Sequence, residues 1–316
     1  MSEQYSFNTF NPLKNKLNQD IYSSESIKEL DKKLAHVPQA AKVLSNTPTL
    51  KISRLLKEIK SELIKNKHEI ARYYYAESGL DETRFQKEFS RTLFQLEHFS
   101  DYIVSSDWQN RSDYKDSINE KIFVKQKIPI GPVLVMGASN FPLAYSTIGG
   151  DSVAALAAGC PVIVKAHPYH VGTSLEVMKA IEKAIETLTF PKGTFTHVID
   201  EGFEIAGYLA KHSVVKGIGF TGSISGGESI IKLVHARNHP IPVFTEMGSL
   251  NPIFILNSYD FKKSADLAKQ LAHSVCNDRG QFCTKPGIIF IPKTNNGTKL
   301  SEQLKDEITA FKSGPM

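Results

Sequence analysis

Cys283 and Glu246 are the two side chains whose surroundings most favour chemistry. Cys283 lies in Arg279–Thr284, a polar, glycine-containing stretch typical of a loop that exposes a thiol. Glu246 follows the strand-like run Ile241–Thr245 and precedes a Met-Gly pair, where a carboxylate has no packing role. A thiol and a carboxylate at such positions predict covalent catalysis by a thiolate, with the carboxylate as general base.

Two further polar side chains follow predicted strands. Asn140 belongs to the turn Gly137–Pro142, where its amide either projects from the turn or caps the next helix. Lys165 ends the apolar run Val162–Lys165, where it is either a ligand-binding ammonium or a solvated strand terminus. Ligands of open α/β sheets bind at the carboxyl ends of the strands, so both positions are candidate site residues.

A glycine-rich turn that contains Gly222, Ser223 and Gly227 follows the predicted strand Val214–Phe220. Glycines and small hydroxyl residues before a helix let backbone N–H groups approach a phosphate, whose charge the helix dipole favours. The glycine spacing differs from the usual dinucleotide pattern, and the turn lacks the Gly-Lys-Ser/Thr of a nucleoside triphosphate loop. The turn therefore indicates a phosphate site only together with the other features.

The elements that must position these residues alternate along the chain. Residues 25–105 show apolar residues at helical spacing and predict an amphipathic helical layer, closed by the polar connection Ser105–Ser112. Strands are predicted at Lys121–Lys127, Pro132–Met136, Pro161–Lys165, Thr194–Ile199, Val214–Phe220 and Ile241–Thr245. Helices are predicted at Pro142–Ala158, Thr173–Thr187, Phe203–His212 and Gly226–Arg237. This alternation predicts an α/β fold with a doubly wound, Rossmann-like parallel sheet.

The same patterns predict three parts of the chain. Residues 1–120 form a helical segment that packs on the cofactor domain, and residues 121–245 form the dinucleotide-binding domain. Residues 246–316 form a third part, with a strand at Ile288–Pro292 and a helix at Lys299–Phe311.

Composition narrows the class of protein. In 316 residues, the net charge of +5 is spread without a block of like charge, which argues against a nucleic-acid partner. No apolar run reaches the roughly 18 residues of a membrane span, and the first twenty residues lack a signal core, so we expect a cytoplasmic protein with no membrane partner. Cys160, Cys276 and Cys283 lack the spacing of a zinc site or a disulfide framework, and no metal is expected.

Several ordered motifs together resemble the aldehyde dehydrogenase superfamily. They resemble most its bacterial branch of 2,5-dioxovalerate (α-ketoglutarate semialdehyde) and long-chain aldehyde dehydrogenases. The motifs are Glu77–Leu80, Pro129–Pro132, Gly137–Pro142, Gly149–Asp151, Ala157–Pro168, Pro240–Pro252 and Gly280–Thr284. The resemblance implies oxidation of a small-molecule aldehyde to an acid with NAD(P)⁺, through a thiohemiacetal and a thioester on cysteine.

The resemblance also implies a role for each candidate residue. Cys283 would be the nucleophile, Glu246 the base and Asn140 the oxyanion donor. The residues implied to bind the cofactor are Lys165, Gly222, Ser223 and Gly227.

The cofactor preference rests on one departure from the family pattern. Many relatives that favour NAD carry a glutamate three residues after the lysine, and this chain has Pro168 there. A glutamate would repel a 2′-phosphate, so its absence favours NADP, with NAD as the alternative. No phosphate-binding arginine is evident near Asp200, although Lys211 is a candidate substitute.

A second departure is the end of the sequence at Met316. Full-length relatives continue with the rest of the catalytic domain and a C-terminal strand through which they form homo-oligomers. The resemblance therefore implies that residues 246–316 are the start of a catalytic domain that is incomplete in this sequence. The alternatives to a dehydrogenase are a catalytically impaired dinucleotide-binding fragment and a cysteine hydrolase that pairs Cys283 with a histidine.

Overall fold

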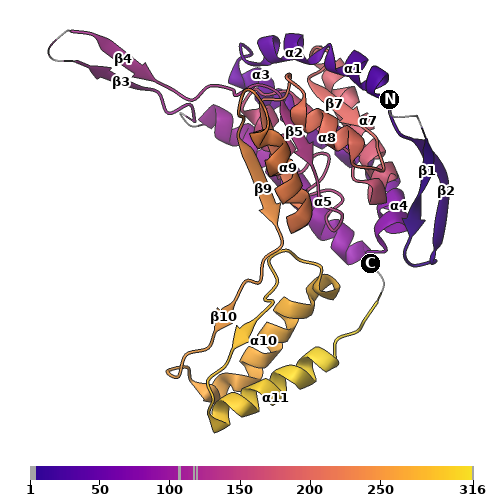
Figure 1. The fold of residues 1–316 in the computed structure, drawn as a ribbon, viewed down its shortest axis with the longest axis vertical. Helices are drawn as coiled ribbons and strands as arrows, with labels where there is room; N and C mark the ends of the chain where they lie inside the picture. Colours follow the sequence, from indigo (N-terminus) through magenta and orange to yellow (C-terminus); the bar gives the residue numbers. More distant parts are fainter. Residues whose placement is uncertain (1–4, 106–107, 117, 119, 315–316) are drawn as a thin grey trace. The chain divides into compact units, whose positions relative to one another are not determined.

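The computed structural model of the protein describes residues 5–105, 108–116, 118 and 120–314 (Figure 1). Internal contacts divide the chain into two compact units, Met1–Glu246 and Met247–Met316. The boundaries expected at 1–120, 121–245 and 246–316 stay a prediction. None of the helices in the described part of the chain is long and apolar enough to cross a membrane.

The first unit is built around a five-stranded sheet. Its strands are β5 (Val133–Met136), β6 (Val162–Lys165), β7 (Phe195–Val198), β8 (Gly217–Gly222) and β9 (Val243–Met247), in the order β7-β6-β5-β8-β9. β5 pairs in parallel with β6 and with β8, and β6 pairs in parallel with β7. Every residue of β5, β6 and β7 is buried, as expected for parallel strands covered on both faces. The predicted doubly wound α/β fold is confirmed.

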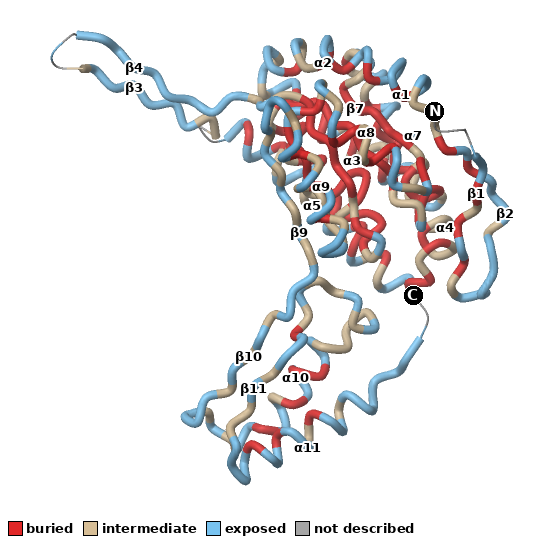
Figure 2. The backbone as a smooth tube through the Cα atoms, in the orientation of Figure 1, coloured by how far each residue is buried: buried red, intermediate tan, exposed pale blue. Residues whose placement is uncertain are grey.

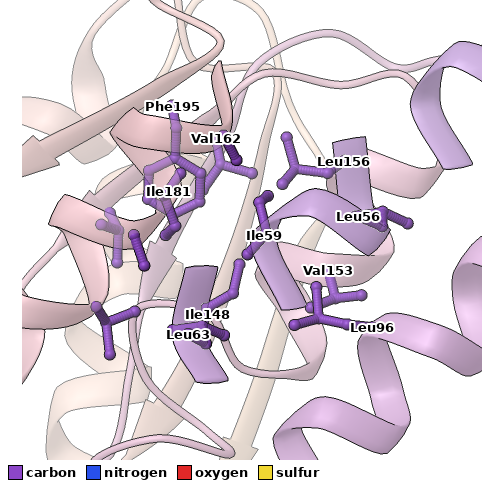
Figure 3. Packing of buried hydrophobic residues seen from close by; sticks show 14 of the residues in the cluster. Leu56, Ile59, Leu63, Leu96, Ile148, Val153, Leu156, Val162, Ile181 and Phe195 are labelled. Carbon is purple, nitrogen blue, oxygen red and sulfur yellow. The ribbon is translucent and has the colours of Figure 1, made fainter. Parts of the chain in front are cut away.

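One face of the sheet is covered by α3 (Thr49–Lys65), α5 (Glu82–Ser105), α6 (Gly150–Ala157) and α7 (Val171–Thr187). Each of these helices turns a buried apolar stripe toward its neighbours. Figure 3 shows how side chains from these helices, their connections and the strands interlock. The labelled side chains are Leu56, Ile59, Leu63, Leu96, Ile148, Val153, Leu156, Val162, Ile181 and Phe195.

The opposite face is covered by α1 (Ile27–Leu34), α2 (Val37–Leu44), α8 (Glu204–Lys211) and α9 (Ile224–His235). Successive residues of a strand point to opposite faces, so Val133 and Val135 join the first core whereas Leu134 and Met136 join this one. Buried residues accordingly concentrate in the strands and the facing sides of the helices (Figure 2). The helices predicted within residues 25–105 are confirmed, and α4 (Lys67–Ser78) is among them.

Two antiparallel hairpins were not predicted. β1 (Ser6–Asn11) pairs with β2 (Lys16–Ser23), and β3 (Ser112–Lys115) pairs with β4 (Ile122–Lys125). The strand predicted at Lys121–Lys127 is therefore present as β4, but the prediction that it belongs to the parallel sheet was wrong. The Asp116 amide donates to the Lys121 carbonyl and closes the hairpin, and all of β4 is exposed. Residues 106 and 107 of the predicted polar connection lie outside the described residues.

The helix predicted at Pro142–Ala158 was wrong over its first half. Turns occupy residues 142–149, and α6 begins only at Gly150. The amides of Leu143 and Ala144 donate to the side chain of Glu88 instead of serving a helix. A tertiary contact therefore overrides the helical pattern of this segment.

The second unit has a small parallel sheet of β10 (Ile253–Phe254) and β11 (Ile289–Phe290). Helices α10 (Ser264–Cys276) and α11 (Asn295–Thr309) pack with it around Leu271, Ala272 and Leu300. Short 3-10 turns complete the described chain: η1 (Pro168–His170) in the first unit, and η2 (Phe261–Lys263) and η3 (Asn277–Gly280) in the second.

Candidate functional site

Most of the predicted site residues gather at one edge of the five-stranded sheet. Lys165 ends β6, Gly222 ends β8, and the turn with Asn140 follows β5, the strand between them. Glu246 lies near the end of β9, next to β8 in the sheet order. Cys283 belongs to the second unit. The parallel topology therefore brings the predicted cofactor residues and the Asn140 turn to a common edge.

The Asn140 turn is closed by its own backbone. The Ala138 amide donates to the Tyr145 carbonyl at 2.9 Å. A Cβ on Gly137 would lie 2.5 Å from both the Ser146 Cα and the Tyr145 oxygen, so only glycine fits where the two segments approach. Asn140 itself is half-buried.

A buried carboxylate on α5 fastens this turn. Glu88 Oε1 accepts from the Leu143 and Ala144 amides at 2.8 and 2.9 Å, and its side chain is fully buried. Glu88 Oε2 accepts from the Tyr74 hydroxyl and from Arg84 Nη1, both at 2.8 Å. Burial raises the pKa of Glu88, and Arg84 opposes part of that shift. Sequence reasoning missed this carboxylate, because nothing in the helical pattern of α5 separates it from a surface glutamate.

Arg84 also reaches the candidate donor directly. Its Nη2 donates to the Asn140 carbonyl at 3.3 Å, and its guanidinium lies 4.3 Å from the centre of the Phe141 ring. The backbone of Asn140 is thus bound by a side chain that is itself paired with Glu88.

Lys165 is held beside the end of the neighbouring strand. Its ammonium donates to the Asp200 carbonyl at 2.8 Å and lies 3.9 Å from Asp200 Oδ2. Burial lowers the pKa of Lys165, and Asp200 opposes part of that shift. Asp200 Oδ1 accepts from the Tyr5 hydroxyl at 2.8 Å, which in turn accepts from the Gly202 amide. Tyr5 and Asp200 were not predicted as site residues, since only the fold brings the N-terminal hairpin region to this strand end.

His170 contacts the same edge from η1. Its Nε2 lies 3.0 Å from the Ala138 carbonyl, and burial lowers the pKa of its ring. Its Nδ1 is buried without a hydrogen-bond partner among the described residues. The neutral ring can therefore donate from Nε2 to the turn that precedes Asn140.

The glycine-rich turn caps α9. The Ser223 hydroxyl accepts from the Gly226 amide at 3.1 Å, and the Gly227 amide donates to the Ser223 carbonyl at 3.0 Å. Gly227 is buried, whereas Ser223 is exposed at the helix N-terminus. A Cβ on Gly222 would lie 2.6 Å from the Phe220 ring, so the ring packs against this glycine and leaves no room for a larger residue.

These residues fit the phosphate and ribose groups of a dinucleotide. The first turn of α9 presents N–H groups that a helix leaves without internal partners, and these suit a phosphate. Lys165 retains N–H donors beyond the one given to Asp200. Asp200 Oδ2 is buried and accepts no hydrogen bond from the described residues, so an unsatisfied acceptor lies beside the lysine.

The Cys283 loop is organised by one asparagine. Asn251 Nδ2 donates to the carbonyls of Cys283 and Lys285 at 2.8 and 3.1 Å, and the Gly287 amide donates to the Leu250 carbonyl at 2.6 Å. Asn251 adopts a positive φ of 45°, a conformation that asparagine tolerates better than most residues. Cys283 is half-buried, and Glu246 is exposed. Sequence reasoning placed Asn251 in a motif but assigned it no contact.

Comparisons with known proteins agree with these features. The model of the aldehyde dehydrogenase family matches residues 1–316. The chain is 39% identical over 221 residues to alpha-ketoglutaric semialdehyde dehydrogenase 2 of Azospirillum brasilense, covering 68% of this chain and 42% of that protein. It is 36% identical over 276 residues to alpha-ketoglutaric semialdehyde dehydrogenase of Acinetobacter baylyi, covering 85% and 52%. The chain thus spans about half the length of these curated relatives.

Solved structures share the fold. NADP-dependent glyceraldehyde-3-phosphate dehydrogenase of Bacillus halodurans, complexed with NADP, matches with a TM-score of 0.85 at 21% identity. The match covers 98% of this chain and 63% of that one. Aldehyde dehydrogenase of Brucella melitensis matches with a TM-score of 0.83 at 20% identity, covering 98% and 61%.

Proposed function

The chain belongs to the aldehyde dehydrogenase family, and we propose that it oxidises an aldehyde to a carboxylic acid with NADP⁺, or alternatively NAD⁺, through Cys283. The observation that carries this proposal is the common sheet edge at which Lys165, the Ser223 turn and the Asn140 turn follow neighbouring strands. A dinucleotide and an oxyanion donor are both needed at one place for this chemistry. A cysteine hydrolase would need neither Lys165 nor the glycine-rich turn.

The nucleophile begins the reaction. The Cys283 thiolate attacks the aldehyde carbon, a C–S bond forms, and the π electrons of the C=O bond move to the oxygen. The Asn140 amide and the Cys283 backbone N–H would donate to this oxyanion, and one such donor is worth about 2.7–4 kcal/mol. Asn140 therefore acts on charge that develops only during the reaction.

The dinucleotide would be held by Lys165 at its ribose and by the turn of Gly222, Ser223 and Gly227 at its phosphates. When bound, the nicotinamide supplies a hydride acceptor. Loss of hydride from the adduct carbon leaves an acyl group bound to the Cys283 sulfur as a thioester.

Glu246 would complete the cycle. Its carboxylate removes a proton from water as the water oxygen attacks the thioester carbon, the C–S bond breaks, and the acid leaves with the thiolate regenerated. The exposure of Glu246 leaves its carboxylate accessible to water.

The names of two relatives support one substrate class. Both proteins reported above are named for alpha-ketoglutaric semialdehyde, so we propose 2-oxoglutarate semialdehyde as substrate, with aliphatic aldehydes as the alternative. We also propose a cytoplasmic location. Because the chain spans about half the length of these relatives, a second candidate is a dinucleotide-binding fragment without turnover.

The test is formation of reduced cofactor by the purified chain with NADP⁺ and 2-oxoglutarate semialdehyde. We expect Cys283→Ala to abolish NADPH formation while the affinity for NADP⁺ stays unchanged. Cys276→Ala is the matched control, because Cys276 is the other half-buried cysteine of the same unit, and it should retain activity. Persistent turnover in Cys283→Ala would refute the assigned nucleophile, and NADP⁺ binding with no turnover in the wild type would favour the fragment.

A further inference from the structure

We propose that Glu88 and Arg84 of α5 are positioning residues that aim the Asn140 amide at the developing oxyanion. This proposal deepens the function proposed above and rests on it, because Asn140 is the oxyanion donor there. Neither residue would touch the aldehyde or the cofactor. Both would act through the backbone of the turn that follows β5.

The carboxylate fixes the far side of the turn. Glu88 Oε1 accepts from two consecutive amides, Leu143 and Ala144, at 2.8 and 2.9 Å. Both of those residues are buried, with exposed fractions of 1% and 0%, so water cannot replace the carboxylate as acceptor without a rearrangement.

The guanidinium fixes the near side. Arg84 Nη2 donates to the Asn140 carbonyl at 3.3 Å while Nη1 pairs with Glu88 Oε2 at 2.8 Å. The Arg84 group also lies over the Phe141 ring, the residue after Asn140. The ion pair therefore spans the turn from Asn140 to Ala144 and connects both ends to one rigid helix.

Comparison with a second buried carboxylate distinguishes a positioning role of Glu88 from a general stabilising role. The segment 137–149 has no helix or strand of its own; backbone hydrogen bonds such as that from Ala138 to Tyr145 close it, and these side-chain contacts attach it to α5. Glu77 on α4 offers a comparison: it is also buried and accepts from two consecutive amides, Gly172 and Thr173, at 2.7 and 2.8 Å. Those amides belong to the first turn of α7, away from the Asn140 turn in sequence. Glu77 can reach the Asn140 turn only through His170, which contacts Ala138, so its removal should cost stability with much less coupling to Asn140 than removal of Glu88.

A double-mutant cycle tests the proposal in the full chain. We expect Glu88→Gln to lower kcat for NADPH formation by about 10-fold or more with KM for NADP⁺ unchanged, since displacement by about 1 Å costs up to 10²-fold. Asn140→Ala should lower kcat by about 10²- to 10³-fold. If Glu88 acts through Asn140, then Glu88→Gln should change kcat by less than about 2-fold in the Asn140→Ala background. Equal effects of Glu88→Gln on kcat in both backgrounds would overturn the proposal. Glu77→Gln is the control, and its effect on kcat should add to that of Asn140→Ala.

Hydrogen exchange gives a readout that does not depend on turnover. In Glu88→Gln we expect amides of residues 138–147 to exchange at least about 10-fold faster, because the turn opens locally, while residues 217–227 keep their rates. Unchanged exchange in 138–147 would overturn the positioning role. A wild-type chain without aldehyde oxidation would refute the proposed function instead, and exchange would still decide whether Glu88 holds the turn.

Discussion

The turn that carries Asn140 and the loop that carries Cys283 are held by different kinds of contact. The turn depends on a Glu88–Arg84 ion pair, with a fully buried carboxylate, supplied by a helix 55 positions earlier in the chain. The loop depends on the neutral amide of Asn251 in a half-buried setting. Charged contacts in a buried setting are costly to break and neutral contacts near solvent are not, so we expect Asn140, the proposed donor, to be fixed more firmly than Cys283, the proposed nucleophile.

The largest effect should come from breaking the buried pair. We expect Glu88→Ala to lower the free energy of unfolding of the first unit by about 3–5 kcal/mol, because the buried amides of Leu143 and Ala144 lose their acceptor and the buried ion pair is broken. The control is Glu97→Ala on the same helix, whose carboxylate is half-exposed and pairs with Lys60 at 2.6 Å. An exposed pair contributes about 0–1 kcal/mol. Urea unfolding of the chain measures both, and equal losses would contradict the contrast drawn here.

A second prediction concerns pH and the core of the first unit. His197 is buried, with its Nε2 2.7 Å from the Ser174 hydroxyl, and burial, followed by nearby Lys33, lowers its pKa to about 3. The unfolded chain, with a histidine pKa near 6.5, binds a proton that the folded chain does not. Stability should therefore fall as pH falls from about 6.5 toward 3, by up to about 1.4 kcal/mol per pH unit.

Between pH 7 and pH 5, wild type should thus lose about 2 kcal/mol more stability than His197→Gln. His68→Gln is the control, because the His68 side chain is 92% exposed. Urea midpoints at the two pH values give the comparison. If the wild type loses no more stability between pH 7 and pH 5 than His197→Gln does, His197 is not the source of this pH dependence.

The smallest effect should come from the Cys283 loop. Asn251→Ala removes two hydrogen bonds to the loop that contains Cys283. The hydrogen-bonded conformation of this loop should lose about 1 kcal/mol of stability relative to opened conformations, which corresponds to about fivefold faster alkylation of Cys283. Asn257→Ala, at an exposed position of the same unit, is the control. Alkylation rates come from peptide mass spectrometry, with Cys276 as the internal reference. An unchanged rate at Cys283 would show that Asn251 does not organise the loop.

The same contrast explains what could be predicted from the sequence. The sheet was predictable, because apolar runs such as Val162–Lys165 are visible in the local sequence. The helical spacing of apolar residues between these runs is visible there as well. Candidate residues could be proposed where a motif surrounds them, as for Cys283 and Asn140, and their roles stay a prediction.

Contacts between distant segments were not predictable. Glu88 looks like any glutamate of an amphipathic helix, yet it binds two amides of the turns at 142–149, where a helix was predicted. Tyr5 reaches Asp200 across 195 positions, a contact that no local pattern encodes. A local motif is therefore enough to suggest candidate functional residues. The residues that hold them in place come from distant segments and are identified only from the fold.

The central claim is that Cys283 carries the acyl group during aldehyde oxidation. The most direct measurement uses Glu246→Gln, which should form the thioester but hydrolyse it slowly, mixed with NADP⁺ and 2-oxoglutarate semialdehyde and quenched in acid. Peptide mass spectrometry should then find the acyl group on the peptide that contains Cys283, in step with a burst of NADPH. NADPH formation with the acyl group on Cys276, or on no cysteine, would contradict the claim.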